Sequence, residues 1–310
     1  MRIVFMGTPD FAVESLRVLV ENNYNIVGVV TMPDKPAGRG HKIQFSPVKK
    51  YALEHNLPIL QPEKLKDEAF LDELRVLKAD LQIVVAFRML PEVVWDMPKH
   101  GTFNLHASLL PQYRGAAPIN WAIINGEKET GATTFFLTHE IDTGKIILQE
   151  KIPIAEADNA EIVHDKLMTM GSGLVKKTVD LIAENKVDAI DQSQFIQSKT
   201  ELKSAPKIFK ETCEIDLKKN IEEVYNFVRG LSPYPAAWMN ITFQGQEEMV
   251  LKVFEVEKDF EKHDLPIGTL VTDGKKQAKI ALKDGFIMLN SVQAAGKKRM
   301  EIGELLRGLK

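Results

Sequence analysis

The chain has 310 residues, a formal net charge of −3 and a single cysteine, Cys213. At about 150 residues per domain, this length predicts two domains, and no apolar run approaches the roughly 20 residues that a bilayer span requires. One cysteine excludes an intrachain disulfide, a zinc ribbon and an iron–sulfur cluster, so we expect a reducing, cytoplasmic compartment and no membrane partner. The charge balance excludes a chain that is a polycation as a whole, although a local basic patch is still allowed.

The first 190 residues show an α/β pattern. Apolar runs that are typical of buried strands occur at residues 3–6, 26–30 and 80–86. Helical spacing is found near residues 11–20, 47–55, 67–76 and 163–174. Continuous apolar strands that alternate with helices indicate a mostly parallel sheet that is covered on both faces.

The pattern changes after residue 190. Residues 191–206 are polar and are predicted to form an extended linker. One helix is predicted near 218–228, followed by short strands at 237–243, 250–256, 268–271, 278–282 and 286–293. Five short strands in so few residues are typical of a small β-barrel. We therefore predict a first domain over 1–190, a linker over 191–206 and a second domain over 207–310.

Two loops in the first domain have weak signals. The turn Gly7-Thr8-Pro9-Asp10 follows the first strand, but it lacks the further glycines of a dinucleotide fingerprint. It is either a plain turn or a ligand-binding one, because ligands bind at this edge of a parallel sheet. Residues 34–42 form a charged loop that contains Arg39 and Lys42. From its residues alone, this loop is either a solvated surface loop or one that reaches a phosphate backbone.

Asn104 and His106 are the best candidates for chemistry. Residues i and i+2 of a strand point to the same side, so an amide donor and an imidazole project together. Such a pair can stabilise an oxyanion and exchange a proton, or it can be structural. Asp142 lies between two further predicted strands, at 133–138 and 145–151, where it is either a turn residue or a carboxylate that favours a charged His106. No GxSxG or HExxH motif occurs, so neither a serine nucleophile nor a catalytic metal is indicated.

Several segments together resemble the folate-dependent formyltransferase family, and they extend over nearly the whole chain. The order and spacing of these segments are more specific than any one of them. They are RIVFMGTPDFA at 2–12, NLHASLLPQYRG at 104–115, LTHEIDTG at 137–144, RGLSPYPAAW at 229–238 and QAAGKKRM at 293–300. The resemblance implies a Rossmann-like formyltransferase domain followed by a small OB-like β-barrel domain.

The resemblance also implies roles for individual residues. Asn104, His106 and Asp142 would be catalytic. The residues implied at the tetrahydrofolate site are Ser108, Leu109, Leu110, Pro111, Arg88, Met89 and Leu90. The residues implied to contact tRNA are Arg39, Lys42, Lys207, Lys297 and Lys298. The implied reaction moves a formyl group from 10-formyltetrahydrofolate to the α-amino group of initiator methionyl-tRNA, in a monomer and without a metal.

The sequence departs from the family pattern at two places. From the end of the third predicted strand it has Ala86-Phe87-Arg88-Met89-Leu90-Pro91, which is one residue shorter than usual and has Arg in place of Gly. Ala236 stands where relatives usually have Gly. Two alternatives also stay open. Formyl transfer could be to another amine, such as an amino sugar nucleotide or glycinamide ribonucleotide, although a purine-type transferase ends near residue 200. A non-catalytic RNA-binding module would not need Asn104, His106 and Asp142 to converge.

Overall fold

The computed structural model describes residues 1–37, 42–196 and 201–309. The chain divides into two compact units. The first contains residues 1–115, 130–152 and 164–203, and the second contains residues 116–129, 153–163 and 204–310. Within the described ranges, no helix combines the length and apolarity that a membrane crossing needs. Because residues 116–129 and 153–163 cluster with the second unit, the division at residues 190 and 206 stays a prediction.

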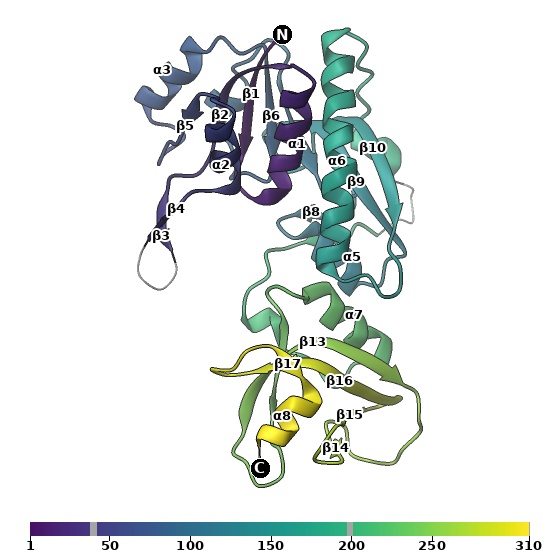
Figure 1. Ribbon diagram of the computed structural model, residues 1–310. Coiled ribbons are helices and arrows are strands. Elements are labelled where there is room, and N and C mark those ends of the chain that lie inside the picture. Colours follow the sequence, from purple (N-terminus) through teal and green to yellow (C-terminus); the bar gives the residue numbers. More distant parts are fainter. Residues whose placement is uncertain (38–41, 197–200, 310) are drawn as a thin grey trace. The chain divides into compact units, whose positions relative to one another are not determined.

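The first unit is built on a seven-stranded sheet with the order β10-β9-β7-β6-β1-β2-β5 (Figure 1). Strands β1, β2, β5, β6 and β7 are parallel, and β9 pairs antiparallel with β7. The bounds of these strands are β1 Arg2–Gly7, β2 Asn25–Val30, β5 Ile59–Leu60, β6 Leu81–Val85, β7 Thr102–His106, β9 Glu129–Phe136 and β10 Ile146–Pro153. The predicted α/β fold with a mostly parallel sheet is confirmed.

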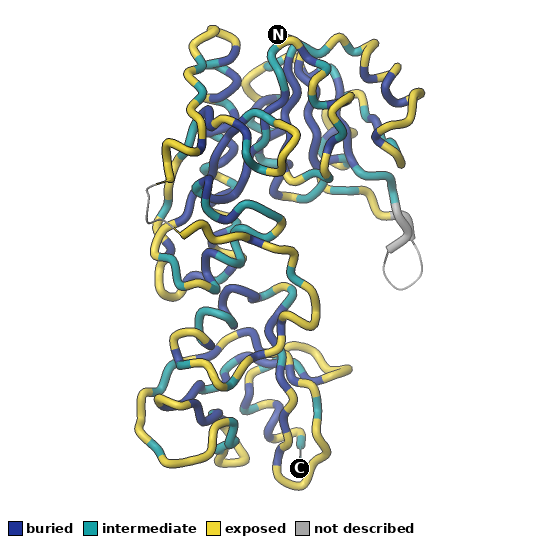
Figure 2. Tube along the Cα trace, turned by 180° about the vertical axis from the view of Figure 1, so that it is seen from behind, coloured by how far each residue is buried: buried dark blue, intermediate teal, exposed yellow. Residues whose placement is uncertain are grey.

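The strands of this sheet are continuous apolar runs, so side chains on both of its faces are buried. Figure 2 shows these strands coloured mostly as buried. On one face, Val4, Met6 and Val84 pack with Phe70 and Leu74 of α3. The helices that lie wholly or mostly in this unit are α1 Asp10–Glu21, α2 Pro47–Glu54, α3 Glu68–Val76, α4 Glu92–Trp95 and α6 Ala160–Ala183. It also contains the short strands β3 Lys35–Ala37, β4 Lys42–Gln44 and β8 Arg114–Gly115.

Helix α6 packs closely against the sheet. A side chain at Gly171 would bring its Cβ within 2.9 Å of Leu105 in β7, and Thr178 shares a 2.8 Å hydrogen bond with Thr134 in β9. The glycine that weakens an isolated helix is therefore required by the approach of α6 to β7. Since Leu105 faces α6, its neighbours Asn104 and His106 face the opposite side of the sheet.

The second unit contains an antiparallel sheet with the order β12-β13-β16-β15-β14, and β17 pairs with β16. Its strands are β11 Ser204–Ala205, β12 Ala237–Ile241, β13 Met249–Asp259, β14 Leu270–Thr272, β15 Ala278–Leu282, β16 Gly285–Ala294 and β17 Met300–Glu301. Its helices are α5 Pro118–Ile124, α7 Ile221–Leu231 and α8 Ile302–Gly308, with a 3-10 turn at Glu211–Cys213. The pairing of β13 with β16 shifts register within β13, an irregularity that bends a strand. The predicted small barrel domain is confirmed by this antiparallel sheet.

Three local features differ from the sequence-based expectations. Helix α7 begins after Asn220, because the Asn220 and Glu223 side chains form a reciprocal capping box there. Ala236 has a φ of +72°, a left-handed conformation that favours Gly, so Ala at this position, where relatives usually have Gly, has a strained backbone. In the predicted linker, Gln192–Phe195 form a 3-10 helix, and Gln192 is buried.

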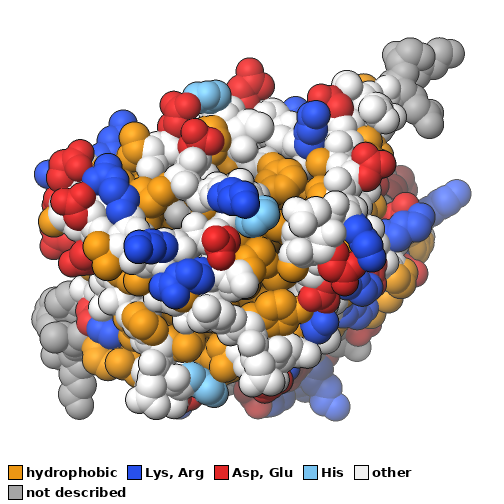
Figure 3. All heavy atoms as spheres, turned by 90° about the horizontal axis from the view of Figure 1, so that it is seen from above, with side chains coloured by type: hydrophobic (Ala, Val, Ile, Leu, Met, Phe, Trp, Pro, Cys, Tyr) orange, Lys and Arg blue, Asp and Glu red, His pale blue; other side chains and the backbone are white. Residues whose placement is uncertain are grey.

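The surface carries mixed charges. On the face in Figure 3, basic and acidic side chains are interspersed, with apolar side chains between them. This mixture agrees with a formal net charge of only −3. Recognition of a polyanion would therefore depend on a few local cations.

Candidate active site

Asn104 and His106 lie at the carboxyl end of β7. Asn104 is paired with Val84 of β6 and Phe135 of β9, and His106 with Thr133 of β9. The strand order reverses between β1 and β6, which follow each other in the sheet but not in the chain. Ligands of open α/β sheets bind outside the carboxyl ends of the strands near such a reversal. The fold therefore places both polar side chains close to its expected ligand-binding edge.

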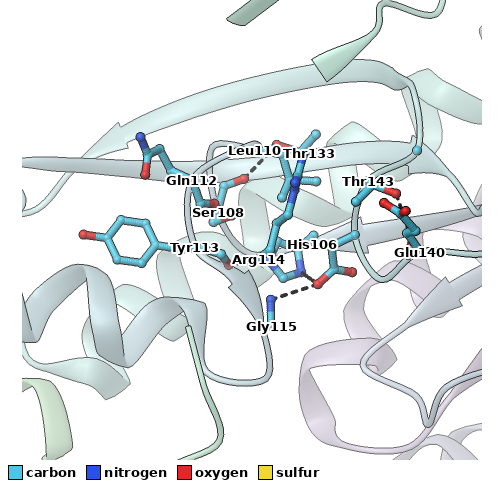
Figure 4. A network of polar contacts seen from close by, with 12 residues as sticks. His106, Ser108, Leu110, Gln112, Tyr113, Arg114, Gly115, Thr133, Glu140 and Thr143 are labelled. Atoms are coloured by element: carbon cyan, nitrogen blue, oxygen red, sulfur yellow. Dashed lines mark hydrogen bonds and ion pairs between the residues drawn. The ribbon is translucent and has the colours of Figure 1, made fainter. Parts of the chain in front are cut away.

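The ring of His106 is fixed by a backbone carbonyl. His106 is only 7% exposed, and its Nε2 lies 2.9 Å from the carbonyl oxygen of Tyr113 (Figure 4). Because a carbonyl can only accept a hydrogen bond, we assign the hydrogen of the neutral ring to Nε2. The lone pair of the neutral ring is then on Nδ1, which is the atom available for proton exchange.

Asp142 faces this free ring atom. Its Oδ2 lies 3.9 Å from His106 Nδ1 and accepts a 2.9 Å hydrogen bond from the Gly115 N–H. The longer distance exceeds a direct hydrogen bond, but it allows an ion pair when the ring is protonated. Asp142 and His106 are 36 positions apart in the sequence, so the fold supplies the convergence that the sequence left open.

The turn that carries Asp142 has a constrained backbone. Asp142 has a φ of +56°, which is unusual for a residue with a side chain. Two residues later, a Cβ at Gly144 would lie 1.6 Å from the Phe136 carbonyl oxygen, so no side chain fits there. Thr143 Oγ1 closes the turn by donating a 3.1 Å hydrogen bond to the Glu140 carbonyl. Unfavourable backbone geometry that is held by surrounding contacts is common at functional sites.

The amide of Asn104 is free to act as a donor. Asn104 is half-buried, and among the residues that the structure describes its side chain makes no hydrogen bond. His106 by contrast is bonded to Tyr113. An unpaired amide donor on the same face as an imidazole can stabilise a developing oxyanion.

Residues 108–111 form a rigid loop beside His106. Ser108 Oγ donates a 2.7 Å hydrogen bond to the Gln112 carbonyl, so this hydroxyl is already used within the protein. The Leu110 N–H donates to Thr133 Oγ1 at 3.2 Å, and the Leu110 carbonyl accepts from Gln149 at 2.9 Å. Leu110 and Pro111 are buried, whereas Leu109 is half-buried. Leu109 is therefore the residue of this loop whose side chain has surface to offer a ligand.

The three candidates that follow β6 have different environments. The guanidinium of Arg88 donates to the Pro62 and Glu63 carbonyls, the latter at 2.8 Å, and burial lowers its pKa from the ordinary value. Met89 is 76% exposed, and Leu90 is buried in the apolar cluster that also contains Val94. Arg88 therefore anchors the loop, and Met89 alone of the three is well exposed.

The candidates for tRNA binding are cationic residues, and the structure describes the side chains of Lys207, Lys297 and Lys298. Arg39 lies outside the described residues, and Lys42 belongs to β4. Lys207 is exposed, with its ammonium 5.4 Å from the ring centre of Phe209. Lys297 and Lys298 are exposed between β16 and β17. In the described part of the chain, Lys207, Lys297 and Lys298 form no ion pair with a carboxylate.

Sequence reasoning missed two residues at this site. Gln192 bonds to the backbone of the Asp142 turn, and Arg114 bonds to Gln192. Gln192 lies in the polar segment predicted to be a linker, and nothing in the local pattern distinguishes it from its neighbours. Arg114 lies in the segment at 104–115, but the resemblance implies no role for it.

Comparisons with known proteins identify the family. The model described as "Formyl transferase" matches residues 1–179, and the one described as "Formyl transferase, C-terminal domain" matches residues 207–310. A solved structure described as an N-formyltransferase from Helicobacter canadensis with folinic acid and dTDP-3-aminofucose has a TM-score of 0.67 and 22% identity, covering 94% of this chain and 98% of that one. At 22% identity, the likeness to this solved structure concerns the fold alone.

Full-length relatives are much more similar in sequence. A protein from Bacteroides thetaiotaomicron described as methionyl-tRNA formyltransferase is 66% identical over 310 residues, covering 100% of this chain and 96% of the relative. A protein of the same description from Flavobacterium johnsoniae is 55% identical over 309 residues, again covering 100% and 96%. The chain therefore belongs to the formyl transferase family, among its methionyl-tRNA formyltransferases.

Proposed function

We propose that this protein transfers the formyl group of 10-formyltetrahydrofolate to the α-amino group of initiator methionyl-tRNA. The observation that carries the chemistry is the meeting of His106 and Asp142, 3.9 Å apart, beside the unpaired amide of Asn104. Full-length relatives at 66% and 55% identity support the choice of substrate. We further propose that it acts as a cytoplasmic monomer and without a metal.

The reaction begins when the neutral amine attacks the formyl carbon. The formyl oxygen becomes an oxyanion, and the Asn104 amide donates a hydrogen bond to it. A donor that is already unpaired needs no reorganisation at this moment, and one such donor typically contributes about 10²–10³ in rate. Asn104 therefore stabilises the tetrahedral intermediate more than the ground state.

Two protons must then move. The nitrogen that attacked carries an extra proton, which passes to the Asp142 carboxylate directly or through a water. The protonated His106 ring gives its Nδ1 proton to N10 of the folate as the bond between N10 and the formyl carbon breaks and the carbonyl re-forms. Asp142 returns its proton to Nδ1, so the pair ends as it began. Tyr113 keeps Nε2 occupied, which directs this exchange through Nδ1.

Apolar surface near this edge is available to the folate. Met89 and Leu109 follow the carboxyl ends of the neighbouring strands β6 and β7, and both have accessible side chains. We assign these two the contact with the folate ring system. Ser108, Leu110, Pro111, Arg88 and Leu90 would shape the pocket as parts of fixed loops.

The second unit would bind tRNA through phosphates rather than bases. Lys207, Lys297 and Lys298 are exposed cations, and cations of this kind supply sequence-independent affinity. Arg39 and Lys42 would add contacts from the first unit. Phosphate contacts position the acceptor end without reading its sequence.

A comparison of three acceptors, each incubated separately, tests the proposal. The protein is incubated with 10-formyltetrahydrofolate and either methionyl-tRNA, glycinamide ribonucleotide or an amino sugar nucleotide, and the formylated product is measured. We expect formyl-methionyl-tRNA alone. Formylation of one of the small acceptors, with none of the tRNA, would replace the proposed substrate. No transfer to any acceptor would leave a binding protein.

A further inference from the structure

Gln192 is a buried polar residue with every hydrogen-bonding position in use. Its side chain is 2% exposed. The amide nitrogen donates to the Asp142 carbonyl at 2.9 Å and to the Gly144 carbonyl at 2.8 Å. The amide oxygen accepts from Arg114 Nε at 3.1 Å and Nη2 at 2.6 Å. An amide has two donors and two acceptor positions, so all four are satisfied within the protein.

These bonds join the two segments that hold the catalytic pair. On one side are the carbonyls of Asp142 and Gly144, in the turn where Asp142 has a φ of +56°. On the other side is Arg114, whose neighbours hold the reacting side chains. The Tyr113 carbonyl accepts from His106, and the Gly115 N–H donates to Asp142. Gln192 therefore bridges the support of the imidazole to the support of the carboxylate.

We propose that Gln192, with Arg114, is a positioning residue that sets the separation of His106 Nδ1 and Asp142 for formyl transfer. This inference rests on the proposed function. Gln192 touches no reacting atom, and it acts through the backbone that carries Asp142. Because misplacement of a catalytic group by about 1 Å can lower the rate about 10²-fold, loss of this bridge should affect turnover more than substrate binding.

The chemistry of the two faces requires an amide. Arg114 offers only donors, and the two carbonyls offer only acceptors, so the bridging side chain must accept on one end and donate on the other. Glu at this position would keep the bond to Arg114 but would turn carboxylate oxygen toward the Asp142 and Gly144 carbonyls. Gln192→Glu therefore breaks one half of the bridge with little change in shape.

The test compares Gln192→Glu with Gln194→Glu, a matched change at an exposed position of the same short helix. For each variant, kcat and both KM values are measured with 10-formyltetrahydrofolate and methionyl-tRNA, and folding is checked by thermal unfolding. We expect Q192E to lower kcat about 10- to 100-fold while both KM values change little. Q194E should behave as wild type.

A double-mutant cycle separates positioning from general stability. If Gln192 acts through Asp142, adding Q192E to Asp142→Asn should lower kcat by less than about threefold further. An equal loss in both backgrounds would contradict the inference, as would Q192E with wild-type kcat. Should Q192E not fold, Arg114→Lys breaks the two-pronged contact from the other side, with the same expectations. A wild-type chain that formylates no methionyl-tRNA would instead remove the proposed function.

Discussion

The proposed catalytic edge of the first unit and the proposed tRNA-binding cations of the second, which we call the basic surface, hold their side chains in opposite ways. His106 and Asp142 are largely buried, and each is bonded to a backbone group of residues 113–115. Lys207, Lys297 and Lys298 are exposed and, where the structure describes their surroundings, have no carboxylate partner. One chain therefore contains a largely buried His–Asp pair, hydrogen-bonded to backbone groups, and a set of exposed lysines without carboxylate partners among the described residues.

The difference fits the roles that we propose for the two regions. Proton transfer and oxyanion stabilisation depend on distances of tenths of an ångström, so their groups must be positioned before substrate arrives. Phosphate binding depends on long-range charge and counterion release, which tolerates mobile side chains. A cation already paired with a carboxylate would have to lose that partner first. The two regions should therefore respond differently to substitution, to salt and to strain.

The largest effect should come from the supported pair. His106→Ala removes the proton donor and Asp142→Asn removes the proton acceptor, so each should lower kcat by about 10²–10⁴. Folate binding, measured by equilibrium titration, should change little. His55→Ala, at an exposed histidine outside the site, is the control. Near-normal turnover in either variant would show that the buried support serves the fold alone.

Asn104 tests whether an unpaired group can belong to the catalytic edge. Asn104→Ala should lower kcat by about 10²–10³, the usual loss for one oxyanion donor, with smaller changes in KM. Because the amide makes no hydrogen bond among the described residues, the melting temperature should barely change. A variant that loses stability but keeps its turnover would assign Asn104 to packing instead.

The basic surface should respond in KM and in salt dependence. The double change Lys297→Ala with Lys298→Ala should raise the KM for tRNA, leave kcat and the folate KM unchanged, and reduce the slope of log affinity against log salt by about 2. The charge-matched control is Lys64→Ala with Lys66→Ala, at exposed positions of the first unit. An unchanged slope would place the phosphate contacts elsewhere.

The sequence predicts which side chains of the site share a strand face better than it predicts which distant residues they contact. Period-two geometry alone predicts that Asn104 and His106 share a face, since they lie two residues apart in β7. Local pattern cannot predict that Asp142 meets His106, because turn residues and catalytic carboxylates have the same composition; only the family resemblance indicated it. The burial of Gln192 could not be predicted for another reason. Its burial depends on partners 48–78 positions away, and its own neighbourhood is polar.

Arg88 is a second residue whose contacts the sequence does not predict. The family resemblance implies that Arg88 lies at the folate site, so a contact with the ligand is the expectation. The structure gives its guanidinium to the carbonyls of Pro62 and Glu63, about 25 positions earlier. Backbone acceptors have no signature in a sequence, so the partner of a buried polar side chain is the part of a site that sequence patterns predict least.

The smallest effect concerns backbone strain, which is present inside and outside the site. Lys78 has a φ of +46° just after helix α3, and Asp142 has a φ of +56°. We expect backbone strain to affect catalysis at Asp142 but not at Lys78. Relieving the strain at Lys78 should therefore raise the free energy of unfolding and leave kcat unchanged. Lys78→Gly should raise the free energy of unfolding by about 0.5–1 kcal/mol, because a left-handed conformation costs a residue with a Cβ about 1–2 kcal/mol and Gly loses part of this gain through unfolded-state entropy.

Denaturant unfolding measures this gain, and kcat should equal that of wild type. Asn185→Gly is the matched control, because Asn185 has a φ of +53° just after α6 and Asn tolerates this conformation better than Lys. Its gain should therefore be smaller. Equal gains at the two positions would mean that side-chain type does not set the strain at helix ends in this protein. A fall in kcat for Lys78→Gly would mean that strain outside the site is linked to catalysis, and the contrast between the two regions would then be incomplete.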